Sequence, residues 1–269
     1  MDMQLLGKVA LVTGSNSGIG AKIAEMLAEE GATVVIHGRN RDRAEQVSSR
    51  ILQQGGQCYV VCGDLAVEDG AETVAREALE LAGQVDILVN NAGGSGDVAD
   101  RSWFGASTDI WRGTFSANVL AAVRLIHALS PEMCERGWGR IINISTAAAL
   151  TPTSGQPDYA AAKAAMLSMS LGLSKALKGT GVTSNSVSPG MIRTAGLNAF
   201  LRQFSEKRGW GAEVARAEDY IIKGSGQTVA RVGEVDDIAY AVTWLASPRS
   251  GFINGANLHV DGGASPSIG

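Results

Sequence analysis

Short apolar runs recur along the chain, and each gap between them has room for one helix. Most runs contain β-branched residues and end at a glycine or a turn-forming residue, which is typical of strands in the core of an α/β protein. The sequence therefore predicts seven strands that alternate with helices. The runs are 9–14, 32–38, 58–64, 86–93, 140–146, 182–190 and 257–263.

The segment after the first strand has helical periodicity. Ile19, Ile23 and Leu27 fall on one face, Lys22 and Glu25 fall on the other, and Gly31 then ends the pattern. Strands that read as nearly continuous apolar runs are covered on both sides, which is typical of parallel sheets with right-handed crossovers. We predict a single-domain α/β fold of the doubly wound Rossmann type, with a seven-stranded parallel sheet and helices on both faces.

Only residues 195–228 break this rhythm. They contain no strand pattern and mix aromatic with charged residues, so we expect a helical insertion that covers a substrate site, here called the cap. No linker divides the chain, and we expect residues 1–269 to form one domain.

Composition narrows the function classes. Hydrophobic residues make up 45% of the 269 positions and charged residues 19%, which favours a globular protein with a sizeable core. A net charge of −4 without runs of like charge argues against nucleic acid or an anionic membrane as a partner. The N-terminus lacks a basic stretch followed by an apolar one, so we expect a cytoplasmic protein.

Cysteines and histidines are sparse. Cys58, Cys62 and Cys134 lack the spacing of a disulfide framework, and we read Cys58 and Cys62 as small buried groups of a strand. The three histidines stand singly, so we expect no catalytic metal.

A glycine-rich turn follows the first predicted strand. Glycines there let the backbone approach a dinucleotide's pyrophosphate and present a helix N-terminus to it. The predicted cofactor-binding residues of this turn are Gly14, Ser15, Asn16, Ser17, Gly18, Ile19 and Gly20.

The end of the second strand bears on cofactor choice. An acid about 20 residues after the glycines would bind the ribose hydroxyls of NAD. This chain instead has Arg39 and Asn40, and an arginine can bind a 2′-phosphate through charge-assisted hydrogen bonds. We therefore favour NADP(H), with NAD(H) as the alternative if Arg39 is only a solvated surface charge.

Tyr159 and Lys163 supply the candidate chemistry. Hydride transfer to a carbonyl needs a proton donor for its oxygen, and free tyrosine has a pKa of about 10. Lys163 follows one helical turn later on the same face, so its ammonium is expected to lower the pKa of the phenol.

The spacing TGxxxGxG, together with NNAG and YxxxK, resembles the short-chain dehydrogenase/reductase family along essentially the whole chain. The resemblance implies that Lys163 also binds the nicotinamide ribose and that Asn118 positions a water that relays protons. On its own, Asn118 is better explained as an ordinary helix-bending or solvent-facing residue. The resemblance further implies pro-S hydride transfer and a homotetramer packed through residues 109–136 and 158–178.

The same resemblance assigns further cofactor contacts and one catalytic hydroxyl. The usual serine position falls on Thr146, with Ser145 as the alternative; we expect Ser145 to point away, because adjacent strand residues face opposite sides. The remaining implied cofactor contacts are Asp64, Leu65, Asn91, Ala92, Gly93, Pro189, Gly190, Ile192 and Thr194.

These residues predict an NADP(H)-dependent oxidoreductase acting on a ketone, an aldehyde or a secondary alcohol, with Tyr159 as general acid/base. Two alternatives remain: an epimerase or dehydratase that retains its cofactor, and a non-catalytic NADP-sensing protein. The sequence does not identify the substrate. Candidate walls of its pocket are Gly94, Ser95, Ala148, Leu150, Gln156 and Met191.

Overall fold

One parallel sheet organises the computed structural model, which describes residues 2–96 and 102–265. Within these residues the sheet has seven strands in the order β3-β2-β1-β4-β5-β6-β7. The predicted seven-stranded doubly wound α/β fold is confirmed. The strands are β1 Val9–Val12, β2 Thr33–Gly38, β3 Gln57–Cys62, β4 Ile87–Asn90, β5 Gly139–Ile144, β6 Val182–Pro189 and β7 Asn257–Val260.

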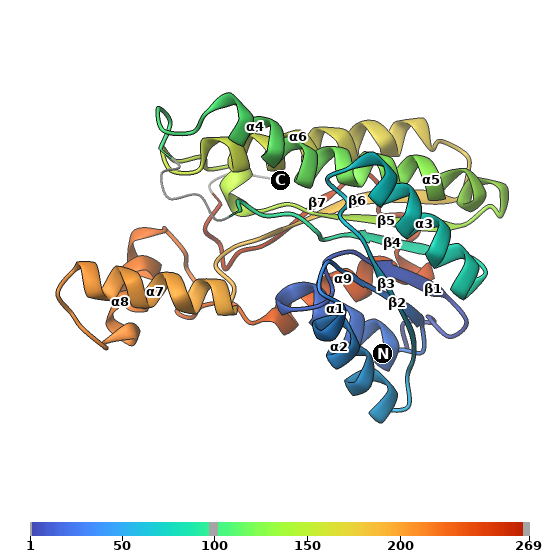
Figure 1. The fold of residues 1–269 in the computed structure, drawn as a ribbon, viewed down its shortest axis with the longest axis horizontal. Helices are drawn as coiled ribbons and strands as arrows, with labels where there is room; N and C mark the ends of the chain where they lie inside the picture. Colours follow the sequence, from blue (N-terminus) through green and yellow to red (C-terminus); the bar gives the residue numbers. More distant parts are fainter. Residues whose placement is uncertain (1, 97–101, 266–269) are drawn as a thin grey trace.

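Helices cover both faces of the sheet (Figure 1). One face packs against α1, α2 and α9, and the other packs mainly against α3 and α5, with α6 beside them. The helices are α1 Gly18–Glu29, α2 Arg41–Gln53, α3 Glu68–Ala82, α4 Thr108–Phe115, α5 Ala121–Glu135, α6 Pro157–Ala176, α7 Ala195–Lys207, α8 Val214–Gly224 and α9 Val235–Ala246.

The central strands β1, β4, β5 and β6 are buried along their whole length. The apolar runs of β1 and β4 predict this burial, whereas β5 and β6 bury polar residues as well. The edge strands differ. Cys58 and Cys62 are only partly buried, so the prediction that they are small buried groups is wrong. The reason is that β3 lies at the edge of the sheet, where fewer neighbours cover each side chain.

The cap contains α7 and α8, which pack against each other and extend away from the sheet (Figure 1). Its small interior is formed by Leu201, Ala217 and Ile222. The chain reaches the cap directly from the carboxyl end of β6 and returns to α9. This places the cap beside the sheet edge at which the parallel strands end.

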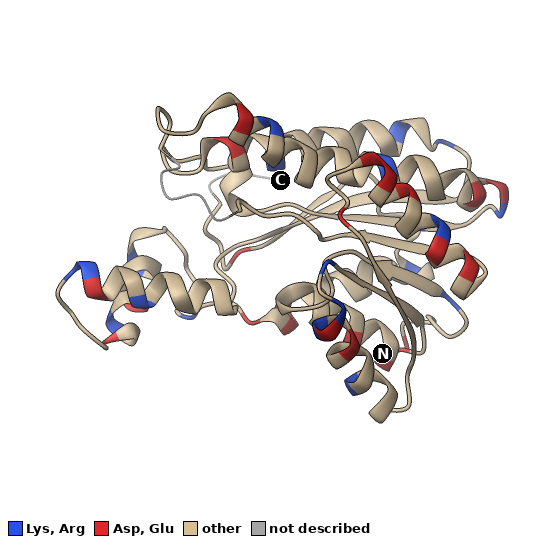
Figure 2. Ribbon diagram, in the orientation of Figure 1, with Lys and Arg blue, Asp and Glu red and all other residues tan. Residues whose placement is uncertain are grey.

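The strand order reverses between β1 and β4, since β2 lies on one side of β1 and β5 lies beyond β4. In doubly wound folds, ligands bind in the crevice at the carboxyl ends of the strands on either side of such a reversal. Charges of both signs are interspersed over the helices (Figure 2). None of the helices described is long and apolar enough to cross a membrane.

Candidate functional site

The glycine-rich turn joins β1 to α1 at this reversal. Gly14 and Gly18 have φ values of 65° and 56°, a region that favours glycine. A Cβ on Gly20 would collide with the side chain of Asn91 and with the backbone of Gly14. The turn therefore depends on glycine both for its conformation and for its close packing.

The N-terminus of α1 is suited to bind an anion. Ser17, the N-cap residue, makes no side-chain capping bond, and the first turn contains no acidic residue. The first amides of a helix have no partners inside the helix and carry its positive dipole end. A pyrophosphate fits this arrangement.

Hydrogen bonds hold the end of β4 against the same turn. The hydroxyl of Thr13 accepts from the backbone amides of Asn91 and Ala92, both at 2.9 Å. The side-chain amide of Asn91 donates to the carbonyl of Thr13 at 2.8 Å. Asn91 thus braces the junction of the two strands.

A cavity of about 490 Å³ extends from this junction over the ends of β2 and β3. We call it the arginine cavity, since the exposed Arg39 and also Arg43 line it. The side chain of Asn40 accepts from the backbone amide of Arg43 at 2.9 Å and so caps α2. The other predicted cofactor residues that line this cavity are Gly14, Asn16, Ser17, Asp64, Leu65, Asn91, Ala92 and Gly93.

A second cavity, of about 220 Å³, lies over the ends of β5 and β6; we call it the tyrosine cavity. Asn91, Gly93 and Gly94 line both cavities, so the two adjoin along the strand ends. The other predicted site residues that line the tyrosine cavity are Ile19, Ser145, Thr146, Tyr159, Lys163, Pro189, Gly190, Ile192 and Thr194.

Tyr159 and Lys163 lie on the first two turns of α6. The ammonium of Lys163 is 5.8 Å from the centre of the Tyr159 ring and donates to the carbonyl of Ile144 at 2.8 Å. Lys163 is 3% exposed, and its burial lowers its pKa to about 8. A cation is thus buried one helical turn from the phenol.

The two candidate hydroxyls have different partners. Thr146 and Tyr159 both line the tyrosine cavity, and the Thr146 hydroxyl acts to lower the pKa of the phenol. The hydroxyl of Ser145 donates instead to the backbone carbonyl of Lys163 at 3.0 Å and is buried. This geometry favours Thr146 as the hydroxyl that acts together with Tyr159.

Asn118 lies in a π-helical turn, Ser116–Leu120, between α4 and α5. Its side-chain amide donates to the carbonyls of Gly94 and Thr114, at 2.9 and 2.8 Å, and its side-chain oxygen accepts from the amide of Gly94 at 3.0 Å. A Cβ on Gly93 would collide with this oxygen and would lie 3.5 Å from the Lys163 ammonium. Asn118 therefore holds the loop after β4 close to Lys163.

Some predicted residues do not line either cavity. The hydroxyl of Ser15 donates to the carbonyl of Val12 at 2.7 Å, inside the turn, while Gly18 and Gly20 contribute backbone geometry. Of the predicted substrate walls, only Gly94 lines the tyrosine cavity. Met191 lines a different cavity between α9 and the end of β7, and Gln156 is exposed with a φ of 58°.

The sequence and the fold were compared with those of known proteins. A family model described as short chain dehydrogenase matches residues 8–204. The chain belongs to this family. It is 37% identical to the uncharacterized oxidoreductase YvaG of Bacillus subtilis, with both chains covered completely. It is 35% identical to a 3-oxoacyl-[acyl-carrier-protein] reductase of Haemophilus influenzae, over 96% of this chain and 98% of that one.

Among solved structures, the L-sorbose reductase of Gluconobacter frateurii, complexed with NADPH and L-sorbose, superimposes with a TM-score of 0.93. The two chains are 30% identical and both are covered completely. The short-chain dehydrogenase described here is therefore an oxidoreductase of a class that uses nicotinamide cofactors. The described residues contain no group of three potential metal ligands.

One expectation about this short-chain dehydrogenase is wrong. The sequence suggested that Lys163 lowers the pKa of Tyr159, but burial raises that pKa, and the hydrogen bond with Thr146 only partly opposes the effect. The physical reason is that burial desolvates the phenolate, while the Lys163 ammonium donates to the carbonyl of Ile144 rather than to the phenol. Tyr159 is thus protonated at neutral pH.

His37 lines the arginine cavity, and its ring contacts the glycine-rich turn, a role that was not predicted from the sequence. The position of His37 just before Gly38 and Arg39 could have indicated a role at the cofactor site, but its hydrogen-bond partners are far away in sequence.

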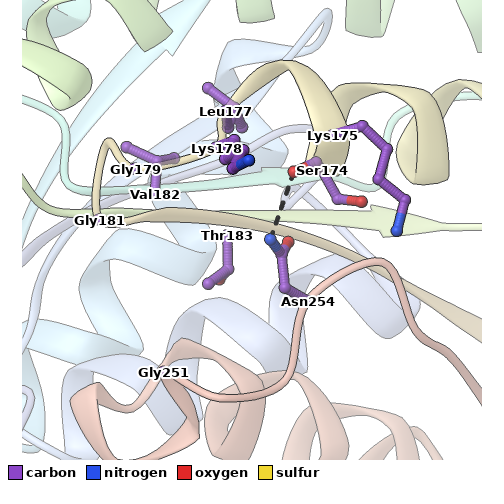
Figure 3. A pocket seen from close by; sticks show the side chains of 10 residues that line it. All are labelled: Ser174, Lys175, Leu177, Lys178, Gly179, Gly181, Val182, Thr183, Gly251 and Asn254. Carbon is purple, nitrogen blue, oxygen red and sulfur yellow. Dashed lines mark hydrogen bonds between the residues drawn. The ribbon is translucent and has the colours of Figure 1, made fainter.

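A separate cavity of about 440 Å³ lies at the amino-terminal end of β6, near Lys178 and Asn254 (Figure 3). No predicted site residue lines it.

Proposed function

We propose that this chain is an NADPH-dependent reductase of small or medium ketones and aldehydes, with Tyr159 as the general acid. The observation that carries the proposal is that Tyr159, Thr146 and the buried Lys163 line one cavity at the strand ends, with the Lys163 ammonium 5.8 Å from the centre of the Tyr159 ring. A protonated phenol suits the reduction of a carbonyl, in which the oxygen must receive a proton.

When bound, the reduced nicotinamide supplies the hydride that reaches the carbonyl carbon. The chain supplies the rest. Tyr159 donates its proton to the carbonyl oxygen, and the Thr146 hydroxyl donates a hydrogen bond to the same oxygen as negative charge develops there. The Lys163 ammonium stabilises the phenolate that Tyr159 leaves behind.

The two cavities fit an extended dinucleotide, and the reductases with known complexes support this assignment. Arg39 supports a preference for NADP(H), because it is exposed at the end of β2 and the described residues place no carboxylate in a salt bridge with it. In this arrangement its guanidinium binds the 2′-phosphate. Asp64 and Leu65 flank the adenine, while Pro189, Gly190, Ile192 and Thr194 orient the nicotinamide.

A panel of carbonyl compounds assayed with NADPH and NADH in parallel tests the reaction, the cofactor and the substrate class together. We expect substrate-dependent loss of NADPH, with slower reaction from NADH. Equal rates with both cofactors would remove Arg39 from its assigned role. Cofactor binding without net consumption would instead favour an epimerase, a dehydratase or a sensor.

Tyr159→Phe tests the mechanism. Without the phenolic proton, kcat is expected to fall by about a thousandfold, within the range typical of general acid catalysis. The Kd for NADPH should stay unchanged, because the phenol is not needed for binding. Carbonyl reduction at the normal rate by this variant would contradict the mechanism.

We also propose a cytoplasmic homotetramer whose subunits pack through α5 and α6. Leu171 on α6 is 48% exposed, and Leu120, just before α5, is 45% exposed. An apolar contact between subunits would bury both side chains. Light scattering coupled to gel filtration measures the number of subunits directly, and a monomer would contradict this proposal.

A further inference from the structure

His37 lies next to the last residue of β2 and is 3% exposed. The backbone amide of Gly14 points at its Nδ1 at 3.1 Å, and its Nε2 lies 3.2 Å from the carbonyl of Gly63. Because a peptide N–H can only donate, Nδ1 must accept. The ring proton therefore lies on Nε2, which donates to Gly63.

The backbone of His37 contacts the same turn. The amide of Ser15 donates to the carbonyl of His37 at 2.8 Å, and the amide of His37 donates to the hydroxyl of Ser15 at 3.0 Å. Two successive amides of the glycine-rich turn, those of Gly14 and Ser15, thus end on one residue. Through its ring, His37 also joins this turn to the end of β3.

The hydrogen bonds from the glycine-rich turn to His37 determine which of its backbone groups face the cavities. The amides of Gly14 and Ser15 are directed at His37, and the residues that begin α1, Ser17 and Ile19, line the two cavities. The carbonyl of Gly14 is held as well, since the side-chain amide of Asn91 donates to it at 3.3 Å. The peptide units of Gly14 are therefore fixed on both sides before any cofactor binds.

We propose that His37, as a neutral Nε2–H imidazole, is a positioning residue that fixes the glycine-rich turn and thereby sets the affinity for NADPH. The inference rests on the proposed function. Burial lowers the pKa of His37 to about 4; Arg39 acts in the same direction, while Gly63 and Asp64 oppose the shift. The ring is therefore neutral at neutral pH and keeps its acceptor for Gly14.

Two polar variants separate the acceptor from the donor. In His37→Asn, the side-chain oxygen can take the place of Nδ1 and accept from Gly14. In His37→Gln, the longer side chain can place its amide near the Nε2 position and donate to Gly63, but it leaves the Gly14 amide without its acceptor. Both variants lose the ring, so its packing is removed in each.

The experiment measures the Kd for NADPH by fluorescence titration, together with kcat at saturating NADPH. Loss of a buried acceptor should make His37→Gln bind NADPH about tenfold more weakly than His37→Asn, while kcat stays within about twofold for both. Equal Kd values for the two variants, or a loss confined to kcat, would overturn the proposal. Gln53→Asn, which exchanges the same two side chains at an exposed position of α2 outside both cavities, is the control.

A second measurement needs no variant. In wild-type protein labelled with ¹⁵N-histidine, the spectrum should show His37 as the Nε2–H tautomer at neutral pH, with and without NADPH. An Nδ1–H tautomer or a charged ring would overturn the proposal even if both variants failed to fold. Wild-type protein that binds no NADPH would instead overturn the proposed function, while the tautomer would still report on the turn.

Discussion

The crevice at the strand ends, which comprises the arginine cavity and the tyrosine cavity, is built differently from the cap. In the crevice, polar side chains are buried and held by hydrogen bonds; Lys163 and Asn118 are 3% and 0% exposed. In the cap, Phe204, Trp210 and Tyr220 stack at ring distances of 5.6 to 6.1 Å beneath the exposed Arg208. From this difference we propose that the crevice determines the chemistry and that the cap contacts the variable part of the substrate.

A few contacts connect the two regions. Arg193, between the predicted cofactor contacts Ile192 and Thr194, pairs with Glu218 of α8 at 2.8 Å and with Glu234, the N-cap of α9, at 3.0 Å. The backbone amide of Arg193 also donates to the carbonyl of Gly233 at 2.7 Å. Arg193 thus ties the cap to the body of the protein at the point where the chain leaves the crevice.

The largest difference in kcat is expected between variants of the two neighbouring hydroxyls of the crevice, those of Thr146 and Ser145. Thr146→Val keeps the shape of the side chain and removes the hydrogen bond to the carbonyl oxygen, so kcat should fall by about a hundredfold. Ser145→Ala should lower kcat by about threefold or less, because that hydroxyl bonds only to a backbone carbonyl. Steady-state kinetics of the pair, with Thr146→Ser as the active control, decide between them. A larger loss in Ser145→Ala would reverse the assignment.

Titration of Lys163 should affect only the chemistry of the crevice. Burial lowers the pKa of Lys163 to about 8 and raises that of Tyr159, so the ammonium loses its proton first as the pH rises. We expect kcat/KM for carbonyl reduction to be constant from neutral pH to about 8 and then to fall by up to about tenfold per pH unit. A pH profile measures this. A decline that began on the acidic side of neutrality would contradict the assignment.

Breaking the ion pairs of Arg193 should change KM for the carbonyl substrate more than kcat. In Arg193→Gln, both ion pairs are lost and the cap is held less firmly, so KM for the carbonyl substrate should rise about threefold to tenfold, while kcat changes by about twofold or less. Arg202→Gln, at an exposed arginine of α7, is the control and should change neither constant. A loss confined to kcat would place Arg193 in the chemical step.

The smallest effect is expected inside the cap. Arg208→Gln removes the stacking of the guanidinium on Phe204, Trp210 and Tyr220, which should cost about 1 kcal/mol or less at this exposed position. Chymotrypsin should then cut within residues 195–228 faster, with the Kd for NADPH unchanged. Arg76→Gln on α3 is the control. A weaker affinity for NADPH would show that the cap is coupled to the crevice.

The two regions also differ in what the sequence could predict. The seven strands, the glycine-rich turn and the proximity of Tyr159 to Lys163 follow from local periodicity and spacing, so they were predictable. The raised pKa of Tyr159 was not, because it depends on burial by residues that are distant in sequence. The contacts of His37 with Gly14 and Gly63 and the π-helical turn at Asn118 are likewise products of tertiary packing.

For the cap, the sequence indicated helices that contain aromatic residues. It did not indicate which residues those helices or aromatic side chains would contact. Charged residues such as Arg193 and Arg208 look alike in sequence, yet one joins two helices through ion pairs and the other stacks on aromatic rings. Spacing does not distinguish these roles: Phe204 lies one turn before Arg208 on α7, but the decisive partners, Tyr220 and Glu218 on α8 and Glu234 at the start of α9, lie elsewhere.

The central claim is that only side chains of the crevice form hydrogen bonds with the reacting oxygen. A crystal structure with NADP⁺ and an unreactive alcohol or ketone analogue tests this claim most directly. We predict that the hydroxyls of Tyr159 and Thr146 both lie about 3 Å from that oxygen, while α7 and α8 contact only the rest of the ligand. An oxygen bound by side chains of the cap, with Tyr159 out of hydrogen-bonding reach, would contradict the account.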